Sequence, residues 1–242
     1  MNIKTILITG ASKGLGASFA FTLANEGYKI IGIARNETQL NSIINNLPNN
    51  HLNHEAISFD ISDETFITKY LKDLNIYCLI NNAGIASSKL LQDSTSEDID
   101  QIIRLNLVSA LNISNAVIPK MIENNVGRII NISSVLGIRP LKLVGAYSIS
   151  KSALIQMTKS QSIELAKYNI LVNALAPGYI ITDLNREFLE SDKVTPLVNK
   201  IPLKRVAKIE ELSPVIKMLV DPNNTYMTGS IINVDGGMSA SL

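Results

Sequence analysis

The sequence predicts an α/β fold, a doubly wound parallel sheet of about seven strands with helices on both faces. Short apolar runs rich in isoleucine and valine alternate with longer amphipathic segments along all 242 residues, as in repeated strand–helix–strand units. Glycine-rich or small polar residues directly follow several of these runs, as they do where parallel strands end at a binding crevice. Because no segment has the composition of a linker, we expect one domain over residues 1–242.

The composition favours a globular, core-forming protein. Hydrophobic residues make up 46% of the chain, charged residues 18%, and the net charge is +1, which gives no electrostatic case for nucleic-acid binding. The single cysteine, Cys78, cannot form an internal disulfide, in agreement with a reducing compartment. The first apolar run is too short for a signal peptide, and no run approaches the ~18 apolar residues of a membrane span. We therefore expect a cytoplasmic protein without membrane or nucleic-acid partners.

The first predicted unit is a strand at residues 5–8, a glycine-rich turn and a helix at residues 17–25. This arrangement aims backbone N–H groups and a helix N-terminus at a phosphate. Glycine admits the close approach of a ligand to the backbone. The glycines are Gly10, Gly14 and Gly16, a spacing that differs from GxGxxG, and a purely structural turn is the alternative interpretation.

The end of the second strand, residues 28–34, bears on the choice of dinucleotide. An acidic residue there hydrogen-bonds a bare ribose 2′-OH. In this chain the strand ends at Arg35, and Lys13 lies in the glycine turn. Two cations and no carboxylate favour a 2′-phosphate. We therefore predict NADP(H), with NAD(H) as the alternative.

The remaining segments continue the alternation. Helices are expected at residues 38–47, 65–73, 96–123, 147–168 and 210–220, and strands at residues 55–59, 77–80, 127–132, 170–175 and 229–234. Residues 183–206 have no strand pattern, and we expect a substrate lid with one or two short helices there. His51 and His54 lie in or beside a polar loop with no cysteine cluster in the chain, so no metal site is predicted.

A tyrosine and a lysine four residues apart give the clearest chemical signal. Tyr147 and Lys151 share one face of the predicted helix. A phenol titrates near pH ~10, and a neighbouring ammonium lowers its pKa by roughly 1–3 units, towards the pH at which proton transfer works best. An ordinary amphipathic helix can carry the same pair, so the rest of the chain must decide. Several other polar or glycine-rich positions also follow predicted strands and should border the same crevice. These positions are residues 10–16, Asp60, Asn82, Ser134 and Pro177.

The order of these motifs resembles that of the short-chain dehydrogenase/reductase family, whose fold is of the Rossmann type. The matching segments are the glycine turn at residues 9–16, Asp60, the Asn-Asn-Ala-Gly run at residues 81–84, Asn106, Ser134, Tyr147-x-x-x-Lys151, Pro177-Gly178 and the Val-Asp-Gly-Gly run at residues 234–237. The resemblance covers essentially the whole chain. Within the family it is strongest to 3-oxoacyl-(acyl-carrier-protein) reductases and similar small carbonyl or polyol dehydrogenases.

The resemblance implies a catalytic tetrad of Asn106, Ser134, Tyr147 and Lys151. Tyr147 would be the acid or base, Lys151 would lower its pKa and bind the nicotinamide ribose, and Ser134 would donate a hydrogen bond to the reacting oxygen. Asn106 would hold a water that links Lys151 to solvent. The predicted cofactor contacts are Gly10, Ser12, Lys13, Gly14, Leu15, Gly16, Arg35, Asp60, Ile61, Asn82, Ala83, Gly84, Tyr147, Lys151, Pro177, Gly178, Ile180 and Thr182.

We therefore expect an NADP(H)-dependent oxidoreductase that interconverts a carbonyl and a secondary alcohol, with 3-oxoacyl thioesters as one substrate class. The alternatives are a polyol, sugar or other small-carbonyl dehydrogenase that uses NAD(H), and a catalytically silent nucleotide-sensing protein. Carrier-protein reductases usually carry arginines just before the fifth and sixth strands. Only Arg128 and Lys167 lie near those places here, which weakens the acyl-carrier assignment. The resemblance also implies a homotetramer or homodimer.

Overall fold

The computed structural model describes residues 3–181 and 194–241, and its centre is one parallel sheet. The strands lie in the order β3-β2-β1-β4-β5-β6-β7, and every neighbouring pair is parallel. This result confirms the predicted fold class. The strands are β1 (Thr5–Thr9), β2 (Lys29–Ala34), β3 (Glu55–Ser58), β4 (Cys78–Asn81), β5 (Gly127–Ile132), β6 (Ile170–Pro177) and β7 (Ile231–Val234).

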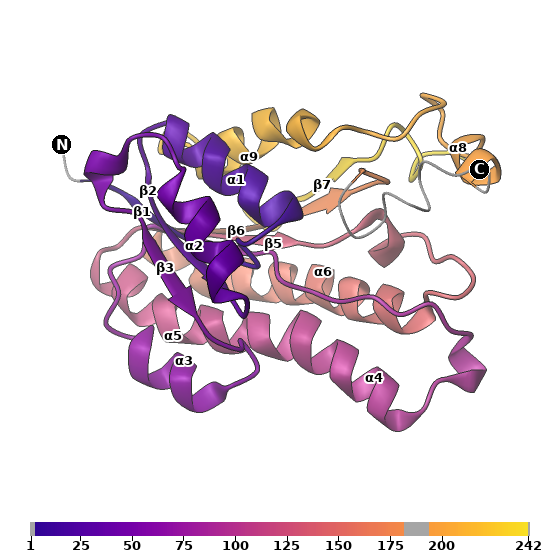
Figure 1. Cartoon of the computed structure of the whole chain (residues 1–242), viewed down its shortest axis with the longest axis horizontal. Coiled ribbons are helices and arrows are strands. Elements are labelled where there is room, and N and C mark those ends of the chain that lie inside the picture. The colour runs from indigo at the N-terminus through magenta and orange to yellow at the C-terminus, as the bar shows by residue number, and fades with distance from the viewer. Residues whose placement is uncertain (1–2, 182–193, 242) are drawn as a thin grey trace.

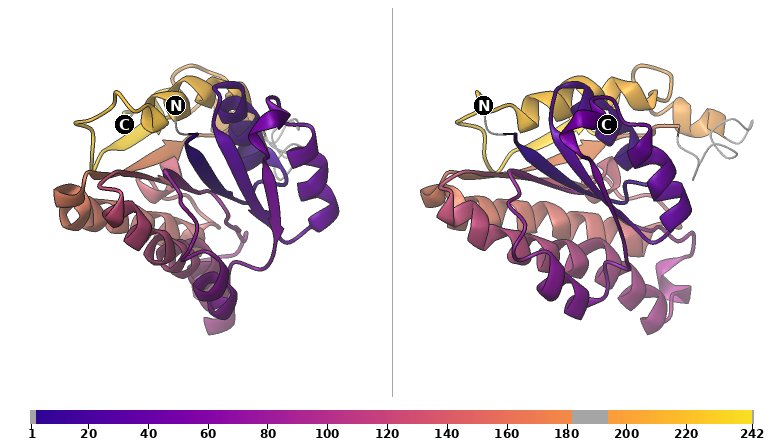
Figure 2. Two further views of the ribbon diagram at one scale, coloured as in Figure 1. Left: turned by 90° about the vertical axis from the view of Figure 1, so that its left-hand side faces the viewer. Right: turned by 60° about the vertical axis from the view of Figure 1, so that its left-hand side comes forward.

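Helices cover both faces of this sheet. Figure 1 shows α1, α2 and α9 on one side and α3, α4, α5 and α6 on the other, and the two turned views in Figure 2 keep this division. The described helices are α1 (Gly14–Asn25), α2 (Glu37–Asn45), α3 (Glu64–Tyr70), α4 (Ser96–Ile103), α5 (Ser109–Glu123), α6 (Gly145–Leu165), α8 (Thr195–Val198) and α9 (Ser213–Val220).

The sheet is buried on both faces, as is usual for parallel strands. Every residue of β4, β5 and β6 is buried. One core cluster packs Phe19 and Leu23 of α1 with Ile216 of α9 against the sheet. A second packs Ile113 and Val117 of α5 against the opposite face. The apolar runs read from the sequence therefore form the central layer, which leaves the polar residues after them at the strand ends.

The predicted helix at residues 96–123 is divided by a π-helical turn, Arg104–Val108, which separates α4 from α5. By length and composition alone, Ser96–Glu123 is apolar enough to cross a membrane. However, Ile113, Val117 and Met121 of α5 lie in the core, so this part of the segment is a core helix. The π-helical turn contains Asn106.

The boundaries of the helix that carries the tyrosine also differ from the prediction. The helix that carries the tyrosine begins at Gly145, ahead of Tyr147, and a 3₁₀ turn, Ala166–Tyr168, follows its end. The predicted lid falls partly outside the described residues, because these omit 182–193. The described remainder of the lid contains the short helix α8.

Candidate active site

The glycine turn after β1 adopts a backbone that requires glycine at its three glycine positions. A Cβ atom built on Gly16 would lie 2.2 Å from the Gly10 carbonyl oxygen, and Gly10 and Gly14 have φ angles of +69° and +56°. A side chain would clash at Gly16, and the positive φ angles disfavour one at Gly10 and Gly14. Lys13 precedes α1 in an extended conformation, and its side chain does not cap the first N–H groups of this helix. The turn thus fits the diphosphate of a dinucleotide, which such N–H groups bind.

Asn82 and Thr9 hold this turn against the segment that follows β4. The Asn82 side-chain amide donates to the Thr9 carbonyl at 2.9 Å and to the Gly10 carbonyl at 3.3 Å. The Thr9 hydroxyl accepts from the backbone N–H groups of Asn82 and Ala83, each at 3.0 Å. The Thr9 hydroxyl thus helps to fix the glycine turn. The sequence analysis missed this role, although Thr9 lies directly before Gly10.

Arg35 and Asp60 lie side by side beyond the ends of β2 and β3. An Arg35 guanidinium nitrogen is 3.8 Å from an Asp60 carboxylate oxygen, and both side chains are exposed. The pKa of Asp60 lies below its ordinary value, chiefly because Ser62 donates its backbone N–H to the carboxylate, with a further contribution from Arg35. Ile61 next to it is buried, and Lys13 and Arg35 are both exposed.

Ser134, Tyr147 and Lys151 come together where β5 meets α6. The side chains of Ser134 and Tyr147 are hydrogen-bonded, and Ser134 also accepts from the backbone N–H of Leu136 at 3.1 Å. The Lys151 ammonium lies 5.7 Å from the centre of the Tyr147 ring and donates to the Ile132 carbonyl at 2.8 Å. The predicted acid–base pair and its serine are therefore neighbours.

The neighbouring serine, Ser133, has a different place. Its hydroxyl donates to the backbone carbonyl of Lys151 at 2.9 Å and is buried. It therefore holds α6 onto the end of β5, whereas Ser134 is the serine that contacts the Tyr147 hydroxyl. This arrangement supports Ser134 as the candidate for the site.

Asn106 joins the site from the π-helical turn. Its side-chain oxygen accepts from the Ile85 N–H at 2.8 Å, and its amide donates to the Ile85 carbonyl at 2.9 Å. The same amide donates to the Ser150 hydroxyl at 3.0 Å. A Cβ atom on Gly84 would lie 3.1 Å from the Asn106 side-chain oxygen and 3.4 Å from the Lys151 nitrogen. π-Helical turns are frequent at functional sites, and this one brings Asn106 next to Lys151.

The end of β6 supplies the opposite wall. Gly178 donates its N–H to the Val234 carbonyl at 2.9 Å, and a Cβ atom there would lie 2.6 Å from the Cα of Asp235. Ile180 is buried and pairs with Ala207. Pro177, Gly178 and Ile180 therefore occupy the expected edge of the sheet. Thr182 lies outside the described residues.

The two halves of the site meet at the segment after β4. Asn82 bonds the glycine turn, and Gly84, two residues later, faces Asn106 and Lys151. The glycine turn and the tyrosine–lysine pair thus border one region at the carboxyl ends of the strands, as expected for this fold class.

Comparison with known proteins agrees with this geometry. A family model described as short chain dehydrogenase matches residues 4–193. The chain belongs to this family. The short-chain dehydrogenase is 35% identical over 240 residues to a 3-oxoacyl-(acyl-carrier-protein) reductase of Thermotoga maritima, with 97% of each chain covered. It is 33% identical over 240 residues to an L-xylulose reductase of Caenorhabditis elegans, with 98% of this chain and 96% of the relative covered.

A solved structure shows the same fold. The match is a gluconate 5-dehydrogenase from Burkholderia cenocepacia in complex with NADP and tartrate, at a TM-score of 0.94 and 27% identity, with 100% of this chain and 97% of that one covered. The protein is therefore an oxidoreductase that acts on a CH–OH group with a nicotinamide dinucleotide, and its substrate is a small molecule.

The electrostatics of the short-chain dehydrogenase differ from the sequence prediction in one respect. The pKa of Tyr147 was expected to be lowered by Lys151, but burial raises it and the hydrogen bond with Ser134 lowers it only in part. Burial also lowers the pKa of Lys151 to about 8, because the charged form of each group is poorly solvated there. The prediction was wrong because sequence spacing shows neither the burial nor that Lys151 donates to the Ile132 carbonyl.

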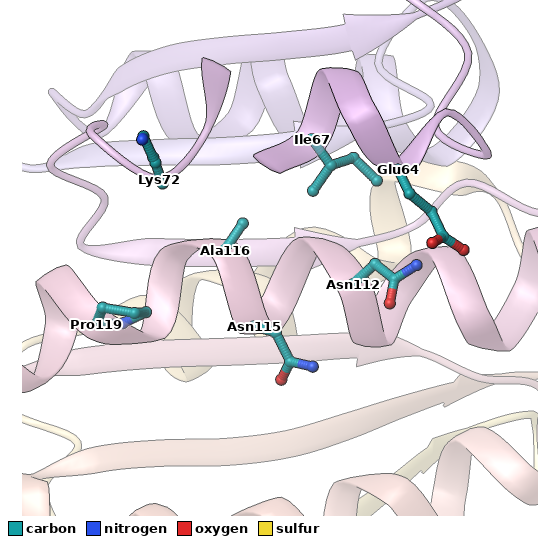
Figure 3. A pocket seen from close by; sticks show the side chains of 7 residues that line it. All are labelled: Glu64, Ile67, Lys72, Asn112, Asn115, Ala116 and Pro119. Atoms are coloured by element: carbon teal, nitrogen blue, oxygen red, sulfur yellow. The ribbon is translucent and has the colours of Figure 1, made fainter. Parts of the chain in front are cut away.

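One pocket of the short-chain dehydrogenase lies away from these residues. It is bordered by α5 on one side and by α3 with the turn after it on the other, as Figure 3 shows. Its lining residues are Glu64, Ile67, Lys72, Asn112, Asn115, Ala116 and Pro119. None of these is a predicted site residue, so the pocket does not enter the proposed chemistry.

Proposed function

We propose that this short-chain dehydrogenase uses NADP(H) to interconvert a carbonyl and a secondary alcohol, with Tyr147 as the acid or base. The observation that carries the proposal is the double contact of residues 82–84. Asn82 bonds the glycine turn, and Gly84 faces the Lys151 amine. A dinucleotide whose diphosphate lies on the turn would therefore reach the tyrosine–lysine pair. The same proposal covers the predicted cofactor contacts, a single domain over residues 1–242 and a substrate lid at residues 183–206.

The residues of the chain handle the proton, and the bound dinucleotide supplies or accepts the hydride. In the reducing direction the Tyr147 hydroxyl donates its proton to the carbonyl oxygen. Its raised pKa keeps the phenol protonated at neutral pH, which suits a proton donor. Ser134 stabilises the charge that develops on the same oxygen, as a preorganised hydrogen-bond donor does. Lys151 would bind the nicotinamide ribose, and Asn106 would hold a water that connects Lys151 to solvent.

The substrate side of Tyr147 is apolar. Tyr147 and Tyr179 pack against a buried cluster, and the proximity of the two phenols contributes to the raised pKa of Tyr179. The cluster consists of Val135, Leu136, Ile201 and Met238. Such a wall suits the aliphatic part of a carbonyl compound. Together with the carrier-protein reductase relative, it supports 3-oxoacyl thioesters as the first substrate class to test.

Arg128 bears on how such a substrate is presented. Its guanidinium is buried and donates to the carbonyls of Gly127 and Asn224 at 2.9 and 2.8 Å. It is therefore not available to dock an acidic carrier protein, and of the two cations near the fifth and sixth strands only Lys167 is exposed. This observation favours a free small carbonyl compound over an acyl-carrier conjugate. The L-xylulose reductase and gluconate 5-dehydrogenase matches keep polyols and sugar acids as the second candidate class.

A substrate screen tests this proposal. Purified protein would be assayed with NADPH and with NADH against 3-oxoacyl thioesters, the same acyl groups on carrier protein, and small sugar and cyclic ketones. We expect faster oxidation of NADPH than of NADH and no advantage for the carrier-bound substrate. Saturable NADPH binding without turnover of any carbonyl would instead support a catalytically silent nucleotide-binding protein.

Replacement of Arg35 by alanine should weaken the binding of NADPH but not that of NADH. A lost charge-assisted hydrogen bond to the 2′-phosphate corresponds to about 1.5–3 kcal/mol, or roughly a 10- to 100-fold increase in the KM for NADPH. The KM for NADH should stay unchanged, because NADH lacks that phosphate. Lys4→Ala serves as the control, since Lys4 lies just before β1, at the amino ends of the strands and away from the candidate site. An equal loss for both dinucleotides would contradict the role of Arg35.

We also propose that two or four copies of the chain assemble. Large aliphatic side chains are exposed on α5 and α6, and Ile163 is 80% exposed, so an interface on these helices would cover apolar surface. Leu111 and Ile149 lie on the same two helices and are also exposed. Ile163→Asp is expected to shift the protein to a smaller species in analytical ultracentrifugation. Phe21→Asp, on α1 of the other layer, should not change the size of the species, and an equal effect of both substitutions would contradict this interface.

The single buried Cys78 agrees with the cytoplasm as the compartment.

A further inference from the structure

Ser150 lies between two members of the predicted catalytic tetrad. It is fully buried on α6, one residue before Lys151. Its hydroxyl donates to the backbone carbonyl of Tyr147 at 2.7 Å and accepts from the Asn106 amide at 3.0 Å. A serine hydroxyl has one hydrogen to donate, so the direction is fixed. The bonds run from Asn106 through Ser150 to the main chain of Tyr147.

The bond from Ser150 to the preceding turn is not unusual in itself. Serine and threonine hydroxyls inside helices often bond a carbonyl three or four residues earlier, and Ser162 does so in α6. The second bond distinguishes Ser150 from Ser162, because it comes from Asn106, which belongs to a different helical segment. Asn106 is fixed in turn by Ile85, whose N–H and carbonyl both bond its side chain. Ser150 therefore ties the first turn of α6 to the π-helical turn and to the loop after β4.

These contacts hold the reacting groups at a set distance. Tyr147 lies in the first turn of α6, where the start of the helix has no side-chain cap. The Asn106 side-chain oxygen and the Lys151 nitrogen both lie next to Gly84. A shift of the first turn of α6 would therefore move Tyr147 relative to Asn106 and Lys151. Small misplacements of a catalytic group reduce rates strongly.

We propose that Ser150 is a positioning residue, which couples the Asn106 amide to the main chain of Tyr147 and thereby keeps the tyrosine aligned for proton transfer. This inference rests on the proposed function of Tyr147. Because Ser150 is fully buried, it has no surface that a substrate or dinucleotide could reach, so its effect should appear in kcat and should depend on Asn106.

The chain offers a matched control for Ser150→Ala. Ser148 is on the same helix and is also buried, but its hydroxyl has no hydrogen-bond partner among the residues that the structure describes. We expect Ser150→Ala to reduce kcat about tenfold, the effect of one lost neutral hydrogen bond. NADPH affinity, measured by fluorescence titration, should stay close to that of the wild type, and the thermal unfolding midpoint should fall by only about 2–4 °C for the lost buried bond. Ser148→Ala should leave kcat and NADPH affinity unchanged.

A double-mutant cycle separates positioning from packing. In an Asn106→Ala background, Ser150→Ala should cause little further loss, because the two residues act through one chain of bonds. Ser150→Thr keeps a hydroxyl and should restore most of kcat. A wild-type kcat in Ser150→Ala, or the same fractional loss with and without Asn106, would overturn the inference. If Tyr147→Phe abolishes turnover while Ser150→Ala does not reduce it, only this inference fails. If Tyr147→Phe stays active, the proposed function itself fails.

Discussion

Tyr147→Phe is expected to reduce kcat by about 10³-fold, with NADPH binding nearly intact. A positioned general acid contributes roughly 10²–10⁴-fold to a rate, and phenylalanine removes only the hydroxyl that donates the proton. The fold should tolerate the change, because Ser134 keeps its bond from the Leu136 N–H. The lost hydrogen bond would then cost about 1 kcal/mol of unfolding free energy. Steady-state kinetics and NADPH titration measure the two effects separately.

Tyr168→Phe is the control for this substitution. Tyr168 lies in the 3₁₀ turn that follows the end of α6, the same helix that carries Tyr147. Its ring lies under the Lys167 ammonium, on the far end of that helix from the site. This variant should keep full activity. Activity retained in Tyr147→Phe, or lost equally in both variants, would refute the assignment of the proton donor.

Lys151→Met is expected to abolish activity and, at neutral pH, to stabilise the fold. The Lys151 side chain is buried, and its pKa of about 8 lies below the ordinary value of 10.5 because of that burial. The buried charge thus costs about 3 kcal/mol of unfolding free energy at pH 7. Methionine removes this cost and forfeits the hydrogen bond to the Ile132 carbonyl, worth about 1 kcal/mol. The free energy of unfolding of the variant at pH 7 should therefore be about 2 kcal/mol higher than that of the wild type.

The difference should shrink and then reverse as the pH rises, because the neutral amine no longer bears the cost of a buried charge but keeps its hydrogen bond to the Ile132 carbonyl. Below pH 8 the amine is protonated in both the folded and the unfolded protein, so the folded state bears the full cost. Between about 8 and 10.5 the folded state releases its proton first, and the wild-type protein gains stability relative to the variant as the pH rises. Denaturant unfolding at several pH values measures this trend. Lys159→Met, at an exposed position of the same helix, should show no such trend. A variant less stable than the wild type at pH 7 would contradict the account of Lys151.

The fold was predictable because its signals are local. Each strand is a short apolar run, and the residues directly after those runs, such as Asn82 and Ser134, lie at the predicted edge of the sheet. Glycine spacing also indicated where the backbone needs room, as Gly16 shows. These features depend on a few neighbouring residues, so they can be read without the tertiary structure.

The features that were missed depend on contacts between distant segments. The π-helical turn at Asn106 is set by bonds to Ile85, and the sequence gives no sign of this pairing. The upward pKa shift of Tyr147 results from burial by several elements. Arg128 looks like a surface cation in the sequence, yet its guanidinium is buried against Asn224. Ser150 lies within the Tyr147–Lys151 motif, but only the tertiary structure shows its contact with Asn106.

The central claim is that the chain brings a carbonyl carbon to the nicotinamide while Tyr147 supplies the proton. A turnover experiment with NADPH in which both hydrogens at C4 are deuterium, followed by mass spectrometry of the alcohol, tests it most directly. With the best substrate of the screen, we predict one deuterium on the carbinol carbon for the wild type and no alcohol above background for Tyr147→Phe. An alcohol without deuterium, or labelled alcohol formed equally fast by Tyr147→Phe, would contradict the claim.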